Sequence, residues 1–463
     1  MSKKIKLGFV VLATIFMISC FFITPFAGLD ATGMHYLGIF VWWMVMMIAE
    51  LIPTFLSCVA TLAIAVAVGV TNLNTAFSSF GQSTCWLLIG ALGMAAGLSN
   101  SGLLNRLALL VMKLFPGTYK GQIWAMSIAS MVVAPTVPST TAKSSILMPV
   151  CSTICDELGY GPHSEGARGL LSCTNSVTNC CGPMFMTGGI VPAMMLALYN
   201  GSISWLGYLK LALIWGLVVF FGLVFFHLYF FNPDKGAKKE DIKILDKAVI
   251  QKRLDQMGKM SKKEIISLSV LVLTILLWIT ESVHGIPTAI VAIAAWVVLF
   301  VFGLFAVPEL SSRMMWPVWV MVGGSLGVIN LLQSTGVASW IGNLVAPVIS
   351  YVAGSPFLIV IGCSILSSAL MMGMVNYLIT AALCISLLSS AAIDPICILF
   401  AVCISGMIFV LAPQNVPLFA AEGMSNGKID HRDMVPASIA FIVVNIVGMA
   451  LSVPWWKILG FIY

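Results

Sequence analysis

Long apolar runs separated by short polar segments recur along the whole chain. Many of these runs approach the roughly 20 residues that a helix needs to cross a bilayer, and none shows the alternation typical of a transmembrane barrel strand. The pattern predicts an all-α polytopic membrane protein with about 11 transmembrane helices. We place these spans at residues 7–27, 33–52, 53–71, 84–104, 166–199, 206–231, 265–284, 286–306, 318–345, 396–424 and 434–458.

Composition and charge placement add a topology. The chain of 463 residues is 60% hydrophobic and 9% charged, whereas soluble globular domains carry about 25% charged residues. The hydrophilic stretch 232–264 holds 10 of the 23 Lys and Arg residues, and basic loops lie on the cytoplasmic side. We therefore expect a multi-pass protein of the cell (inner or plasma) membrane, with the N-terminus and the 232–264 loop in the cytoplasm. The net charge of +6 reflects this topology and indicates no nucleic-acid partner.

An internal repeat divides the single membrane domain, residues 1–463. At an offset of 234 residues, the tripeptide Ile-Pro-Thr at 52–54 returns at 286–288, and Pro183, Phe185 and Gly189 return as Pro417, Phe419 and Gly423. After a first helix at 7–27, we predict repeat 1 at 33–231, a linker at 232–264 and repeat 2 at 265–460. Five spans in each repeat, an odd number, give the two copies opposite orientations. Inverted repeats with interrupted helices are typical of alternating-access transporters.

Two apolar segments fit no full span and are predicted to be re-entrant hairpins. The first, 117–150, contains the stretch VAPTVPSTTAKSSILMPV, with its tip near residues 138–140, and the second is 354–388, with Asn376, Tyr377 and Thr380 at its tip. Spans 166–199 and 396–424 carry matching interruptions at 182–192 and 413–423. Non-helical backbone is tolerated inside a membrane only where it is buried in protein or lines a cavity. The four breaks therefore predict a binding site where they converge.

Ionisable residues inside the predicted spans are functional candidates. Lys143 follows the first tip and has no charged counterpart, since Ala382 stands at the matching position of the second hairpin. A lysine there suits a carboxylate ligand; the alternative is an inert side chain that reaches toward the membrane surface. Glu50 and Glu281 precede the repeated Ile-Pro-Thr, which favours a role in the scaffold over proton coupling.

These elements together resemble the divalent anion:sodium symporter family, including its citrate, tartrate and 2-oxoglutarate/malate exchanger branch. The resemblance rests on Glu50 to Pro53, on PSTTAK in the first hairpin, on the TGG motif at Thr187, on MVNYLITAA in the second hairpin and on VPWWKILG at 453–460. It implies eleven spans, two re-entrant hairpins, a homodimer and an elevator movement. It also implies a Ser-Asn-Thr signature at each tip, although Thr140 stands where the family usually has asparagine.

The same resemblance implies the site residues. We expect the substrate to contact Ser139, Thr140, Thr141, Lys143, Thr187, Asn376, Tyr377, Thr380 and Asn415. A coupling sodium ion, the one cofactor expected, is assigned to Pro135, Ser139, Thr140, Gly188 and Asn376. Exchanger-like members tend to carry a basic residue at the position of Lys143, as though a fixed cation replaced a bound sodium ion, so sodium symport and exchange both stay open.

The sequence thus predicts a secondary active transporter of small di- or tricarboxylate anions, embedded in the lipid bilayer. Coupling is to sodium or to counter-exchange of a carboxylate. The main alternative is a symporter of an inorganic oxyanion such as sulfate. A passive channel and an intramembrane enzyme are weaker alternatives, and the chain contains no HExxH motif of a membrane zinc protease.

Overall fold

The computed structural model describes residues 3–49, 51–137, 139–199, 202–235, 244–344, 354–372, 380–381, 384, 392–410 and 421–463. Within these ranges the regular structure is helical, and the only β-type pairing is an isolated bridge between Ile393 and Ile462. The helices of the first half are α1 Lys3–Ser19, α2 Ala31–Ala49, α3 Thr54–Ala67, α4 Leu73–Phe77, α5 Ser83–Ser101, α6 Leu103–Leu114, α7 Tyr119–Val133, α8 Thr140–Glu157, α9 Glu165–Cys180, α10 Ile190–Leu198 and α11 Trp205–Phe230. Those that follow are α12 Lys247–Met257, α13 Lys262–Ile279, α14 Glu281–His284, α15 Thr288–Val301, α16 Val307–Arg313, α17 Trp316–Ser334, α19 Pro356–Met372, α21 Pro395–Ser405 and α23 His431–Ile458.

This helical architecture confirms the predicted all-α polytopic class. In the described part of the chain, α2, α5, α11, α17 and α23 are long and apolar enough to cross a membrane, and α3, α15, α19 and α21 are shorter apolar helices. The exact number of eleven spans stays a prediction. Helix α6 was not predicted, because its amphipathic sequence buries one face, including Leu104 and Met112, and exposes Leu110 and Leu114.

Helices α3 and α15 are shorter than the predicted spans 53–71 and 286–306, for the same local reason. Each begins directly after a proline, Pro53 or Pro287, and proline is compatible only with the first turn of a helix. Each ends just before a glycine with positive φ, Gly69 at 79° or Gly303 at 68°, a conformation in which glycine avoids the steric cost of a side chain. Both pairs of signals lie 234 residues apart, so the two helices have the same length.

The packing partners also come in corresponding pairs. Helix α3 packs against α2 and α17, and α15 packs against α13 and α5. Helices α7 and α9 pack together, as do α19 and α21, and the long helices α11 and α23 pack against each other. Each of these contacts in the first half therefore has a counterpart at about the same offset in the second half.

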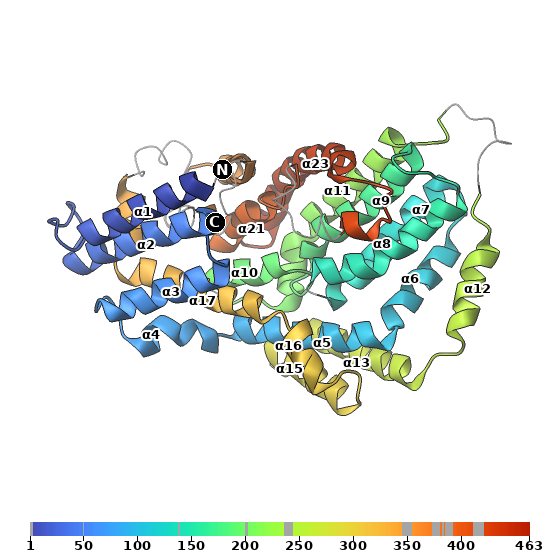
Figure 1. The fold of residues 1–463 in the computed structure, drawn as a ribbon, viewed down its shortest axis with the longest axis horizontal. Coiled ribbons are helices and arrows are strands. Elements are labelled where there is room, and N and C mark those ends of the chain that lie inside the picture. Colours follow the sequence, from blue (N-terminus) through green and yellow to red (C-terminus); the bar gives the residue numbers. More distant parts are fainter. Residues whose placement is uncertain are drawn as a thin grey trace.

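Two groups of helices with separate cores make up the molecule. One buried cluster joins residues of α2, α3 and α17, and a larger one includes α7 to α11, α21 and α23 together with α5 and α15. Figure 1 shows α1 to α4 at one end and α6 to α9 with α12 at the other, with α10 and α5 between them. Helix α10 packs against α5 and α17 as well as α21, so it lies at the boundary between the two ends.

Candidate functional site

The first predicted break lies between helices α7 and α8. Helix α7 ends at Val133, a short 3-10 turn covers Ala134 to Thr136, and α8 begins at Thr140. Pro135 cannot donate a helical hydrogen bond, and Ser139 caps α8 by accepting a hydrogen bond of 3.2 Å from the amide of Ala142. The tip therefore lies where the sequence predicted it, although Pro138 lies outside the described residues. Whether the pair re-enters the membrane stays a prediction.

The second break separates α9 from α10. Helix α9 ends at Cys180, residues 182–184 form a 3-10 turn, and α10 begins at Ile190. The backbone folds tightly on itself here, because a Cβ atom on Gly188 would lie 2.0 Å from the carbonyl oxygen of Gly182. Only glycine fits such a close approach.

The two breaks lie against each other through side chains that the sequence singled out. The Thr187 hydroxyl donates to the carbonyl of Pro135 at 2.9 Å. The Lys143 ammonium donates to the carbonyl of Gly188 at 2.6 Å. The structure thus brings together four predicted residues from positions up to 53 apart in the sequence, since Gly188 is 53 residues beyond Pro135.

Lys143 places a buried, ionisable amine at this junction. Its side chain is 0% exposed, its hydrogen bond runs to a neutral carbonyl, and no ion pair with it occurs among the described residues. An ammonium ion buried without a counter-ion is strongly disfavoured. The alternative in which this lysine reaches outward to the membrane surface is wrong, because the amine points into the protein.

The start of α8 adds to the positive potential beside Lys143. Thr140 and Thr141 occupy the first helical turn, where backbone amides lack intrahelical partners and the helix dipole is positive. Both side chains are half-buried, and neither hydroxyl has a partner in the described ranges. A fixed ammonium, free amides and free hydroxyls form an arrangement that suits an anion with several oxygen atoms.

Helix α9, which ends at the second break, carries a buried polar face that sequence reasoning did not single out. Asn175, Ser176, Thr178 and Asn179 are all buried. Asn179 donates to the Asn175 side-chain oxygen at 2.7 Å, and Thr178 pairs with Ser130 of α7 at 3.0 Å. The hydroxyl of Ser176 is buried without a partner among the described residues. The signal was present in the sequence as the run SCTNSVTN at 172–179 inside an otherwise apolar span.

The structure describes fewer of the predicted site residues in the second half of the chain. Asn376, Tyr377 and Asn415, predicted to contact substrate, lie outside the described residues, as does Glu50. Thr380 is 2% exposed, and its hydroxyl has no partner within the described ranges.

Two of the predicted sodium ligands, Pro135 and Gly188, accept hydrogen bonds within the protein. The carbonyl of Gly188 accepts the hydrogen bond of the Lys143 ammonium, and the carbonyl of Pro135 accepts that of Thr187. A sodium ion sharing the Gly188 oxygen would lie close to a buried positive charge, and like charges repel strongly in a low-dielectric interior.

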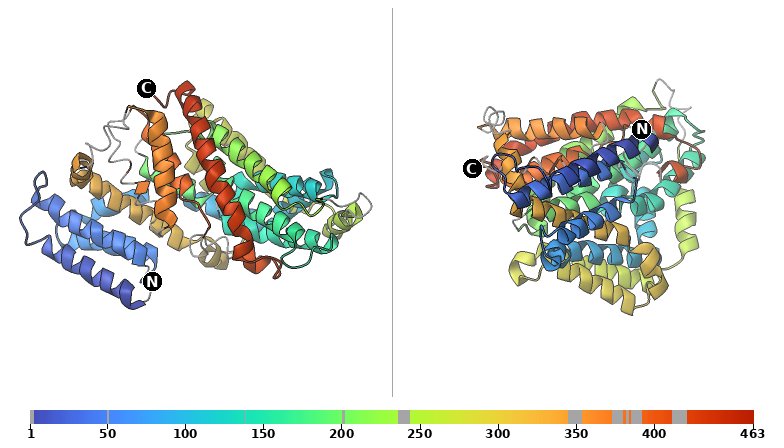
Figure 2. Two further views of the ribbon diagram at one scale, coloured as in Figure 1. Left: turned by 90° about the horizontal axis from the view of Figure 1, so that it is seen from above. Right: turned by 60° about the vertical axis from the view of Figure 1, so that its left-hand side comes forward.

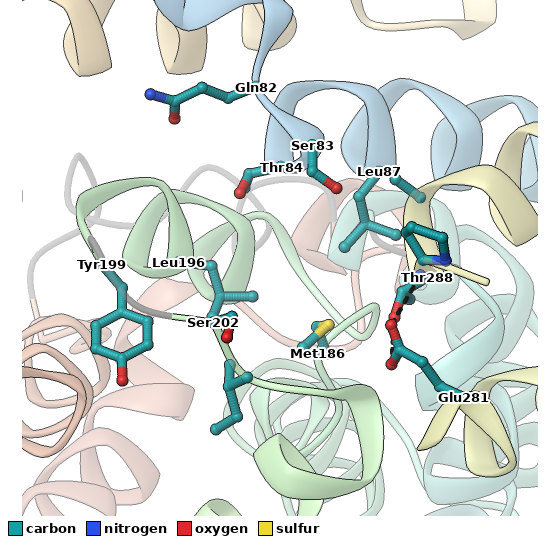
Figure 3. Close-up of a pocket in the computed structure, with 13 residues that line it drawn as sticks. Gln82, Ser83, Thr84, Leu87, Met186, Leu196, Tyr199, Ser202, Glu281 and Thr288 are labelled. Carbon is teal, nitrogen blue, oxygen red and sulfur yellow. Dashed lines mark hydrogen bonds between the residues drawn. The ribbon is translucent and has the colours of Figure 1, made fainter. Parts of the chain in front are cut away.

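A cavity of about 370 Å³ borders this junction on the side of Met186. Figure 3 shows Ser83 and Thr84 of α5 on one side of it and Glu281 with Thr288 on another. The Glu281 carboxylate accepts hydrogen bonds from the amide and the hydroxyl of Thr288, at 3.1 and 2.9 Å. Glu281 therefore supports the start of α15 after Pro287, as the scaffold interpretation expected.

Comparison with known proteins places the chain among membrane transporters. Residues 4–462 match the family profile described as the sodium:sulfate symporter transmembrane region. Dicarboxylate transporter 1, chloroplastic, of Arabidopsis thaliana is 28% identical over 333 residues, covering 69% of this chain and 58% of that protein. The inner membrane protein YbhI of Escherichia coli is 23% identical over 409 residues, covering 84% and 83%. YflS of Bacillus subtilis, named as a malate transporter, is 22% identical over 337 residues, covering 70% and 68%.

The match covers only part of the length of two chloroplast relatives. The chain spans 58% of the length of the chloroplast dicarboxylate transporters 1 that it matches, in Arabidopsis thaliana and in Spinacia oleracea. The family and the chloroplast and Bacillus subtilis relatives are named as transporters and not as enzymes.

Solved structures agree on the fold. The YdaH transporter of Alcanivorax borkumensis superposes with a TM-score of 0.60 at 12% identity, covering 92% of this chain and 99% of that one. MtrF of Neisseria gonorrhoeae superposes with a TM-score of 0.59 at 13% identity, covering 94% and 97%. At these identities the likeness establishes the fold alone.

Proposed function

Because the chain belongs to the sodium:sulfate symporter family, also called the divalent anion:sodium symporters, we propose that it is a secondary active transporter of small di- or tricarboxylate anions. The observation that carries the proposal is the buried Lys143 ammonium, which has a carbonyl partner and no acidic partner among the described residues. A substrate carboxylate supplies the missing counter-charge. The dicarboxylate and malate transporters among the relatives support the substrate class.

Substrate binds between the tip of the first hairpin, at the α7–α8 break, and the second hairpin. One carboxylate accepts hydrogen bonds from Lys143 and from the first turn of α8 at Thr140 and Thr141, with Ser139 holding that turn in place. Thr380 and the second hairpin, with Asn376, Tyr377 and Asn415, receive the other end of the anion. Two carboxylates held by two separate polar surfaces select for a substrate of defined length.

Transport proceeds by alternating access between two inverted repeats, 33–231 and 265–460. The corresponding helix pairs, such as α3 with α17 and α15 with α5, support this proposal. The helices that carry the breaks move as one body past the others, as an elevator. A homodimer, as the family resemblance implies, holds the remaining helices, those without breaks, fixed in the membrane.

Coupling is to exchange of carboxylates rather than to sodium. The Lys143 ammonium lies at the Gly188 carbonyl, where a sodium ion was expected, and a fixed charge cannot leave with the substrate. The site returns across the membrane most readily when a second anion neutralises Lys143. Replacing Lys143 with Thr removes this charge. In that variant we expect the rate of carboxylate exchange to fall and sodium-dependent carboxylate uptake to appear.

The membrane orientation follows the charge pattern, with the N-terminus and the 232–264 loop in the cytoplasm of a bacterial-type inner membrane. The two termini lie at opposite edges of the molecule in the left view of Figure 2.

Proteoliposome uptake tests the function directly. Labelled succinate, malate or citrate should enter vesicles preloaded with an unlabelled dicarboxylate, at a rate that saturates with external substrate and does not depend on sodium. Uptake that requires sodium and no internal anion would contradict exchange while leaving carboxylate transport in place. Competition by sulfate but by no carboxylate would instead identify an oxyanion carrier. Flux that never saturates and shows no counterflow would indicate a channel.

A further inference from the structure

Trp205, the first residue of α11, contacts the candidate site on one side and α13 and α14 on the other. Its side chain is 3% exposed, and none of the sequence predictions involved it. Helix α11 starts here because Ser204 caps it, accepting a hydrogen bond from the amide of Gly207 at 3.0 Å. The cap fixes the position of the backbone amide of Trp205.

Toward the site, Trp205 contacts the break between α9 and α10. Its indole N–H donates to the Thr187 hydroxyl at 3.4 Å, and its ring stacks on Phe185 with centroids 6.2 Å apart. Thr187 in turn donates to the Pro135 carbonyl at the tip of the first hairpin. A hydroxyl has one hydrogen to donate, so the indole donor favours the orientation in which that hydrogen points at Pro135.

On its other side, Trp205 is held by residues of α13 and α14. Its backbone amide donates to the Glu281 carboxylate at 3.1 Å, and its ring stacks on Trp278 with centroids 5.9 Å apart. Glu281 is itself fixed by Thr288 at the start of α15. These helices carry none of the predicted substrate contacts, so Trp205 links the site to a separate part of the fold.

We propose that Trp205, held by Glu281 and Trp278, is a positioning residue that orients the Thr187 hydroxyl and keeps the first hairpin tip against the break. The proposal rests on the proposed transport function. Loss of the indole donor loosens the junction that carries Lys143, and substrate affinity falls while the movement of the helices is preserved.

The first test compares two tryptophans of the same helix. W205F keeps a stacking ring and removes the donor to Thr187; we expect the KM for dicarboxylate uptake to rise about three- to tenfold with Vmax within twofold of the wild type. W215F is the matched control, because Trp215 is also buried and donates to Asn445 of α23 at 2.8 Å rather than to Thr187. It should lower the Tm without changing KM. Equal KM changes in both variants, or a W205F variant with wild-type KM, would overturn the proposal.

A double-mutant cycle tests the route through Thr187. T187V removes the hydroxyl at nearly constant volume, so W205F/T187V should have the same KM as T187V alone. Independent, multiplicative effects on KM would show that Trp205 does not act through Thr187. The pair E281Q and E281A adds a rescue: glutamine keeps an acceptor for the Trp205 amide and should retain most of the affinity, whereas alanine should resemble W205F.

The outcomes separate this inference from the proposed function. If the wild type neither takes up nor is thermally stabilised by succinate, malate or citrate, the function is wrong and the positioning role falls with it. If the wild type transports and the cycle shows no coupling, the function stands and the positioning role is wrong.

Discussion

Lys143 and the glycines around it set the chemistry of the site at the scale of single residues. The lysine is one of the largest fully buried side chains of the protein. Its amine lies close to two glycines, because a Cβ atom on Gly182 would be 2.9 Å from the Lys143 nitrogen and 2.8 Å from the Gly188 oxygen. The small residues of this break therefore make room for a charge as well as for a turn.

Replacing Lys143 with Met should separate activity from stability. Met has a similar length and no charge, so the substrate loses a charge-assisted hydrogen bond worth roughly 1.5–3 kcal/mol, about a 10- to 150-fold loss of affinity. The protein no longer buries an unpaired ammonium, so the Tm in detergent should stay equal or rise. Uptake assays and thermal unfolding measure the two effects, and a K143M protein that unfolds earlier yet transports normally would contradict this account.

Gly182 and Gly189 offer a matched pair of substitutions in the same break. G182A places a methyl group against the Lys143 amine and the Gly188 carbonyl, and we expect carboxylate uptake to fall at least tenfold. G189A meets no atom closer than 3.5 Å and has extended backbone, with φ at −177°, so uptake should stay within about twofold of the wild type. Similar losses in both variants would mean that any side chain in the break is harmful, whatever its distance from Lys143.

At the scale of elements, a buried ion pair connects α6 to the start of α13. Arg106 of α6 contacts Glu264 at 2.6 Å, and their side chains are 10% and 5% exposed. Arg106 also donates to the carbonyls of Met257 and Gly258 at the end of α12. One guanidinium thus joins α6 to two consecutive helices that follow it by more than 130 residues, α12 and α13, at the end of the molecule where Figure 1 shows them.

Removing one partner of this pair should be costly, and removing both should cost less. R106M leaves a buried carboxylate without its counter-ion, which typically costs about 3–5 kcal/mol, whereas R106M/E264M replaces both charges with apolar groups. We expect the Tm at pH 7 to fall most in R106M and to recover partly in the double variant. A double variant less stable than R106M would show that the capping contact between Glu264 and Ser261 contributes more than relief of the unpaired buried carboxylate.

Acidification should weaken the same contact in the wild type. The hydrogen bonds from Arg106 lower the pKa of Glu264 below its ordinary value, although burial opposes this. A carboxyl with a depressed folded-state pKa stabilises the protein above its unfolded pKa, about 4.3 for Glu, and loses that contribution as the pH falls through the folded-state value. The Tm of the wild type should therefore drop more steeply below about pH 4.3 than that of R106M/E264M. Parallel Tm curves for the two proteins would contradict this.

At the scale of the whole molecule, the twelve cysteines make the membrane orientation easy to test. All of them are free and buried, so none should react quickly with a membrane-impermeant maleimide. Ser202, between α10 and α11, and Lys252 of α12 are both exposed. The charge pattern places them on opposite sides of the membrane.

Single-cysteine labelling follows from this placement. In intact cells, S202C should react with the impermeant maleimide and K252C should react only after the membrane is opened. The wild type serves as the background control. Labelling of both variants from the outside would reverse or abolish the proposed topology.

The local signals of the sequence determined where the chain breaks. Proline at 135, the serine cap at 139 and the glycines at 182 and 188 act through their own backbone geometry, so the hairpin tip and the α9–α10 break were predictable from neighbouring residues alone. The same holds for α3 and α15, whose proline and glycine boundaries repeat at 234 residues. Lys143 was identified because a charge in an apolar segment is costly wherever it lies.

Only the tertiary structure decided which groups from distant parts of the chain meet. The contact of Lys143 with the Gly188 carbonyl, the stacking of Trp205 on Trp278 and the pairing of Arg106 with Glu264 join residues 45, 73 and 158 positions apart. Such contacts depend on how helices pack, which no local pattern encodes. The sequence by itself thus determined a helical membrane protein with interrupted spans and a charged tip, while the fold decided that the charge lies against a carbonyl rather than an acid. That pairing depends on the approach of two backbone breaks, and it leaves the positive charge available for an anion.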